Sequence, residues 1–274
     1  MHNQKLKNAL VWIIKTCVFI APLIPLYIAG NLFFPFVTGK AFVFRIIVEF
    51  VFALWLVLAL FYKEYRPRKN WLLCAIGIFV LVVSLATIFG VNPLRSFWSN
   101  YERMEGLLMY FHLFAYFVVL GNVFKKQDWF VLFNLFVVSG ILENIYAVFQ
   151  KLGVLSSIQG GFRVDGTIGN PSYLAAYLIF IAGFCAWLFI EVKNIYAKIY
   201  YAAAGIFTLA IIYLTASRGP VLGLLGGLFL ALLVYLIAAK PADEKGKNIK
   251  KLVLGGFVGL VLLVLTQVLQ LWQA

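Results

Sequence analysis

Long apolar runs, each near the length that crosses a membrane, constrain this chain more than any other feature. Residues 71–91 and 219–239 contain no charged side chain. A helix needs about 20 residues to cross roughly 30 Å of hydrocarbon, whereas the strands of a membrane barrel would alternate over about ten. Because 64% of the residues are hydrophobic and 12% are charged, the composition also excludes a soluble globular domain. The sequence therefore predicts an all-α, polytopic transmembrane helical bundle.

The apolar runs divide the chain into about nine candidate spans. Their ranges are 9–30, 41–62, 71–91, 105–124, 129–150, 173–191, 199–216, 219–239 and 252–271. The first run is too long for a cleaved signal peptide and contains Pro22 and Pro25, so we expect a retained signal anchor. No internal repeat or flexible linker divides the sequence. We therefore expect a single transmembrane domain over residues 1–274.

The basic residues alternate in number between successive loops. If the N-terminus is cytoplasmic, the inner loops hold 15 of the 23 Lys and Arg residues, the outer loops hold six, and two lie within spans. The positive-inside rule then predicts a cytoplasmic N-terminus and an extracytoplasmic C-terminus. The formal charge of +13 thus follows from membrane topology and does not indicate nucleic acid. In the inner loop 240–251, we expect the lysines to contact anionic membrane lipids.

One outer arginine lies in the short connection "TASRGP" between two apolar runs. Arg218 follows Ser217 and precedes a helix expected to begin near Gly219. The positive end of that helix and its unpaired N–H groups would join the guanidinium to form an anion site. Alternatively, Arg218 extends to the lipid head groups and has no further role.

A second arginine lies in the glycine-rich loop "GGFRVDGTIGNPS". Asn170 and Pro171 favour the start of a helix here, with Asn170 as its N-cap. Arg163 either pairs with Asp165 or lies over this helix N-terminus. The second alternative repeats the chemistry of the Arg218 connection and favours an anionic, phosphate-bearing ligand.

The loop after the third span places Arg95 and Arg103 on either side of "SFWSNYE". Its aromatic residues suit a membrane interface. The same combination suits a sugar, since aromatic rings stack on sugar faces while Arg, Asn and Glu bond hydroxyls.

Two spacings within the spans predict helix packing and charge neutralisation. Gly219, Gly223 and Gly227 recur every four residues, which is typical of close helix contacts. Arg45 and Glu49 stand four apart and are expected to neutralise each other.

Residues with the spacing of a metal site or a catalytic triad are missing from the sequence. We therefore expect no metal and no cofactor, and we assign no catalytic residue. Glu143 lies within an apolar run without an obvious local partner, so it is expected to face a polar cavity.

The segments "RSFWSNYERMEGLL", "FRVDGTIGNPSYLAAY" and "TASRGP", in this order, resemble the O-antigen ligase and polymerase family of bacterial membrane glycosyltransferases. The resemblance implies inverting, metal-independent transfer of a glycan from an undecaprenyl-diphosphate donor to a hydroxyl of a glycan, lipid or protein acceptor. The reaction would take place at the extracytoplasmic face of the bacterial inner membrane. Arg163 and Arg218 match the family arginines that contact the diphosphate. Arg95, Arg103, Asn170 and Ser217 are further candidate contacts.

The chain departs from this family in its length. Members have about a dozen spans and a large outer loop with a histidine that acts on the acceptor, and neither His2 nor His112 matches that position. We expect the first part of a longer family domain, one half of a split protein, or a donor-binding relic. A transporter or flippase for a lipid-linked or anionic substrate is the alternative, although interrupted helices at mid-membrane would then be expected.

Overall fold

The computed structural model describes residues 2–68, 70–100, 103–158, 163–240 and 243–273, and these ranges contain helices and no strand. The helices are α1 (His2–Ile20), η1 (Ala21–Leu26), α2 (Thr38–Phe61), η2 (Lys63–Tyr65), α3 (Trp71–Ile88), α4 (Pro93–Trp98), α5 (Leu107–Val123), α6 (Lys126–Lys151), η3 (Gly166–Ile168), α7 (Pro171–Glu191), α8 (Ile195–Leu214), α9 (Arg218–Ala238) and α10 (Glu244–Gln273).

Seven helical segments in the described ranges are long and apolar enough to span a membrane. They are Gln4–Leu26, Thr38–Phe61, Trp71–Ile88, Lys126–Lys151, Pro171–Glu191, Ile195–Leu214 and Arg218–Ala238. The apolar helix α5 is shorter, at 17 residues. The structure thus confirms an all-α chain of multi-pass membrane character. Nine spans and the sidedness of the two termini stay predictions.

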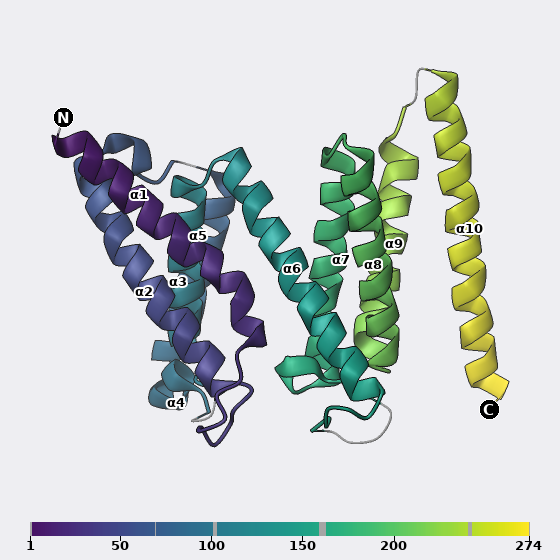
Figure 1. The fold of residues 1–274 in the computed structure, drawn as a ribbon, viewed down its shortest axis with the longest axis horizontal. Coiled ribbons are helices and arrows are strands. Elements are labelled where there is room, and N and C mark those ends of the chain that lie inside the picture. The colour runs from purple at the N-terminus through teal and green to yellow at the C-terminus, as the bar shows by residue number, and fades with distance from the viewer. Residues whose placement is uncertain (1, 69, 101–102, 159–162, 241–242, 274) are drawn as a thin grey trace.

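Successive long helices run in opposite directions, so the connecting segments gather at two ends (Figure 1). One end, here called the arginine end, carries α4, the α6–α7 connection and the start of α9. The other, called the lysine end, carries the start of α1, η2 and the α5–α6 and α7–α8 junctions. The loops that sequence analysis assigned to one face therefore lie at one end of the molecule.

The first helix of the structure differs at both ends from the predicted span 9–30. The helix begins at His2 and ends at Ile20, where a 3-10 helix with Pro22 and Pro25 replaces it. Proline removes a helical N–H donor, and its ring clashes with the preceding turn, which explains the early end. Residues 240–251 also differ from the predicted loop, because α10 begins at Glu244 within them.

Two hydrophobic cores lie on either side of α6, which crosses between the two helix groups (Figure 1). One core joins α1, α2, α5 and the first half of α6, and includes Val51 and Leu58. The other joins α6, α7 and α8, and includes Leu178 and Ile211. A Cβ added at Gly140 of α6 would lie 2.5 Å from the side chain of Ile181 in α7, so this glycine permits the close approach of the two helices.

The predicted glycine contacts of α9 are wrong for the described residues. A Cβ added at Gly219, Gly223 or Gly227 would meet nothing within 4 Å, and α9 has no buried residue. The glycines instead lie on open surface of α9. Spacing alone predicted a tight contact, but the neighbouring helices do not approach this face.

Candidate functional site

At the arginine end, the Arg163 side chain contacts the connection between α8 and α9. Its Nε donates to the Thr215 backbone oxygen at 3.0 Å, and its Nη2 donates to Ser217 Oγ at 3.1 Å. Ser217 directly precedes Arg218. The structure thus brings the loop with Arg163 and the connection with Arg218 together, although more than 50 residues separate them along the chain.

Arg218 is the exposed first residue of α9. It lines a hollow of about 440 Å³ together with Ser217, Lys151 and Tyr213. Ser217 is the N-cap of α9, yet its hydroxyl caps no helical N–H group and instead accepts from Arg163. The start of α9 therefore keeps its positive dipole end beside an exposed guanidinium.

The first turn of α7 lies against the same connection. Asn170 caps this helix as predicted, with its side-chain oxygen accepting from Ser172 N at 2.9 Å and Tyr173 N at 3.2 Å. Ser172 Oγ lies 3.4 Å from Ser217 Oγ. Asn170 thus has a structural role in placing α7, and its direct contact with a ligand stays a prediction.

On the other side of this turn, Arg103 approaches Tyr173. Arg103 Nη1 donates to the Tyr173 hydroxyl at 3.2 Å, and the guanidinium lies 5.8 Å from the centre of the ring. The first turn of α7 therefore lies between Arg103 and the Arg163–Ser217 contact. Arg95 is exposed on α4, and no hydrogen bond or ring contact joins it to these residues in the described part of the chain.

Arg103 and Tyr173 also line an apolar groove of about 640 Å³ between α2, α5, α6 and η1. Further lining residues are Ile24, Phe44, Met109, Leu113 and Phe136, with Lys40 and Glu105 as the other charged groups. Lys40 Nζ donates to the Thr167 backbone oxygen at 2.6 Å. Lys40 is not among the predicted site residues, although a lysine at the outer start of a span is a usable signal.

A buried carboxyl on α6 fixes the segment that precedes α7. Glu143 is fully buried and accepts from Thr167 N at 3.0 Å and from the Thr167 hydroxyl. The Thr167 hydroxyl also lies 2.6 Å from the Pro25 backbone oxygen. Instead of the expected polar cavity, the buried Glu143 carboxyl thus meets the backbone N–H and the hydroxyl of Thr167 in η3.

Asp165 points into the same buried region and forms no ion pair with Arg163. Gln150 Nε2 donates to Asp165 Oδ1 at 2.6 Å, and Ile158 N donates to Asp165 Oδ2 at 2.8 Å. Of the two alternatives for Arg163, the structure therefore excludes pairing with Asp165. Arg163 is left to bond the α8–α9 connection, and no carboxylate pairs with it in the described ranges.

The predicted Arg45–Glu49 pair is wrong. Arg45 Nη2 donates to the backbone oxygens of Met104 at 2.6 Å and Arg103 at 3.1 Å. Glu49 instead lies 3.0 Å from His112 Nε2 of α5. Arg45 therefore supports the chain segment that carries Arg103, and the four-residue spacing did not reveal partners from other helices.

Comparison of the chain with protein-family models, curated proteins and solved structures finds no match.

Proposed function

We propose that this protein binds a glycan donor linked to undecaprenyl diphosphate and transfers the glycan to an acceptor hydroxyl. The proposal is that of an O-antigen ligase-like enzyme, inverting and independent of metal, in the bacterial inner membrane. The observation that carries it is the contact of Arg163 with Ser217 beside Arg218. Two arginines from distant loops share one end of the bundle with a helix N-terminus and an apolar groove.

The charges at this end suit a diphosphate. Arg163 donates only to a backbone oxygen and a hydroxyl, so no carboxylate neutralises it within the described residues. Arg218 is exposed beside the start of α9. Guanidinium groups bind phosphate oxygens in a bidentate manner, and preorganised donors stabilise charge as it develops on a leaving group.

The apolar groove suits part of the polyprenyl chain. Its walls are largely aliphatic and aromatic, while Lys40 and Arg103 place positive charge among them. Arg103 is linked to the Arg163 contact through the first turn of α7. A lipid tail in the groove would thus have its diphosphate near both groups of cations.

In the proposed transfer, the acceptor oxygen attacks the anomeric carbon while the bond from that carbon to the diphosphate oxygen breaks. The acceptor proton passes to a base, which we do not assign. The negative charge left on the diphosphate is the charge that Arg163 and Arg218 would stabilise.

The test is transfer of a labelled glycan from a polyprenyl-diphosphate donor in membranes that contain the full chain. Arg218→Lys should reduce transfer about 100- to 1000-fold, because a point charge loses the bidentate fork. Arg66→Lys at the lysine end is the matched control, since among the described residues Arg66 donates only to the backbone oxygens of Ala59 and Leu60. Unchanged transfer in Arg218→Lys would contradict the proposal. Movement of intact donor across the membrane without covalent transfer would indicate a flippase instead.

A further inference from the structure

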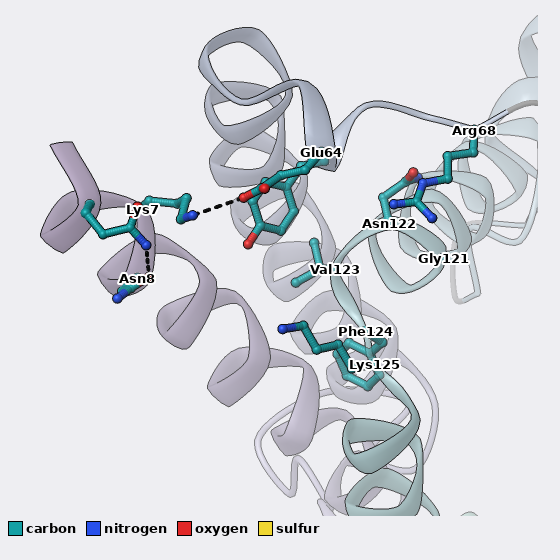
Figure 2. Close-up of a pocket in the computed structure, with 11 residues that line it drawn as sticks. Lys7, Asn8, Glu64, Arg68, Gly121, Asn122, Val123, Phe124 and Lys125 are labelled. Carbon is teal, nitrogen blue, oxygen red and sulfur yellow. Dashed lines mark hydrogen bonds and ion pairs between the residues drawn. The ribbon is translucent and has the colours of Figure 1, made fainter.

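A polar cavity lies at the lysine end, opposite the arginine end of the bundle (Figure 1). It measures about 570 Å³ and is lined by residues of α1, the α2–α3 connection and the α5–α6 junction. Figure 2 shows Lys7 and Asn8 from α1, Glu64 and Arg68 from the connection, and Lys125 from the junction around this space. We call it the lysine-end cleft.

The cleft holds more positive than negative charge. Lys7 Nζ lies 3.1 Å from Glu64 Oε1, so these two groups neutralise each other. Arg68 and Lys125 also line the cleft, and neither forms an ion pair with a carboxylate in the described ranges. Two cations from different segments thus line the cleft, Arg68 beside Asn122 and Lys125 beside Phe124 (Figure 2), and no carboxylate of the described residues pairs with either.

Neutral donors complete the lining. Tyr65 is held in place where Trp55 Nε1 donates to its backbone oxygen at 3.1 Å. Burial, and to a lesser extent the nearby Glu64 carboxylate, raises the pKa of Tyr65 above its ordinary value. A tyrosine hydroxyl is protonated at neutral pH, so Tyr65 adds a hydrogen-bond donor to the residues that line the cleft. The side chains of Gln4, Asn8 and Asn122 add amide groups.

We propose that the lysine-end cleft binds phosphate groups at Arg68 and at Lys125. An arginine fork and a lysine ammonium are the usual partners of phosphate oxygens. The lysine excess at this end predicts that it faces the cytoplasm, where anionic lipids give the membrane surface a negative potential. The phosphate belongs either to the head group of such a lipid or to a soluble phosphate compound. The site is independent of the proposed transfer at the arginine end.

The experiment uses the full chain in nanodiscs and measures binding and the midpoint of thermal unfolding. One arm compares phosphatidylcholine nanodiscs with nanodiscs that also contain phosphatidylglycerol. The other adds inorganic phosphate or glycerol 3-phosphate to phosphatidylcholine nanodiscs at constant ionic strength. The test variant is Arg68→Gln with Lys125→Gln. The control is Lys126→Gln with Lys193→Gln, which removes two charges from the same end outside the cleft.

We expect one ligand to bind and stabilise the wild-type and control proteins. Binding should weaken about five-fold for each cleft charge removed, and about 25-fold in the double variant. A response to phosphatidylglycerol alone identifies a lipid head group, and a response to the soluble phosphates identifies a soluble ligand. Equal weakening in the test and control variants would overturn the proposal, as would no response of the wild type to either ligand. All four substituted residues are exposed, so both variants should retain the helical content of the wild type.

Discussion

Lys7 and Lys126 at the lysine end have partners of a different kind from those of Arg163 at the arginine end. At the lysine end, Lys7 pairs with Glu64 at 3.1 Å and Lys126 pairs with Glu191 at 3.3 Å. At the arginine end, Arg163 donates to a backbone oxygen and a serine hydroxyl. The charges of Lys7 and Lys126 are thus neutralised locally, whereas Arg163 has no carboxylate partner among the described residues.

The difference follows from side-chain chemistry. A guanidinium has five N–H donors in a fixed plane, so two of them can fix its position while others stay available. A backbone oxygen or hydroxyl satisfies these donors without cancelling the charge. Arg45 has the same arrangement, since it donates to the backbone oxygens of Arg103 and Met104. Neutral partners therefore leave the charge of Arg163 uncancelled, and Arg66 at the lysine end is held in the same way by the backbone oxygens of Ala59 and Leu60.

Among the variants that test this contrast between the two ends, the largest loss of glycan transfer is expected at Arg163. Arg163→Lys should reduce glycan transfer about 100-fold or more, since one ammonium cannot reproduce both donations together with a bidentate contact. The measurement is the transfer assay in membranes, with Arg66→Lys as the control. If both variants retain the same activity, the two ends do not differ in the way proposed.

The next effect concerns the stability of the arginine end. Glu143→Leu should lower the free energy of unfolding by about 1–3 kcal/mol, because the Thr167 N–H group would lose its buried acceptor. Glu143→Gln retains an acceptor and should cost less. Chemical unfolding in detergent measures the difference. Glu64→Gln at the lysine end serves as the control, and an equal cost there would refute the contrast between buried and exposed carboxyl groups.

A smaller effect is expected at Ser217. Ser217→Ala removes the hydroxyl that accepts from Arg163 Nη2. A hydrogen bond to a charged group contributes about 1.5–3 kcal/mol, but the Thr215 oxygen still holds Arg163. We therefore expect about a ten-fold loss of transfer, less than for Arg163→Lys. Ser172→Ala is the matched comparison, and a greater loss there would point to a role for Ser172 beyond its 3.4 Å contact.

The smallest effect is expected at the exposed pairs of the lysine end. Lys126→Gln breaks the pair with Glu191, in which the lysine side chain is 82% exposed. Such pairs contribute about 0–1 kcal/mol. The unfolding free energy should change by less than about 1 kcal/mol, and transfer should be unaffected. A large loss of stability would show that charge pairing, and not helix packing, holds this end together.

The success of sequence reasoning depended on whether a feature was local. The Asn170 cap was predictable because the capping residue bonds N–H groups two and three residues away. The Arg45–Glu49 pair was not, because Arg45 bonds the segment before α5 and Glu49 meets His112. The sequence also placed Arg163 and Arg218 in loops of one face, yet it could not identify Ser217 as the residue that joins them.

The amino-acid sequence by itself determined the helical, multi-pass class. In hydrocarbon every backbone N–H and C=O group needs an internal partner, so apolar runs of this length must be helical. Only the tertiary structure decided which loops meet. Helices that are apolar on every side carry little pattern to fix their neighbours, so the Arg163–Ser217 contact and the lysine-end cleft follow from packing and not from any local sequence signal.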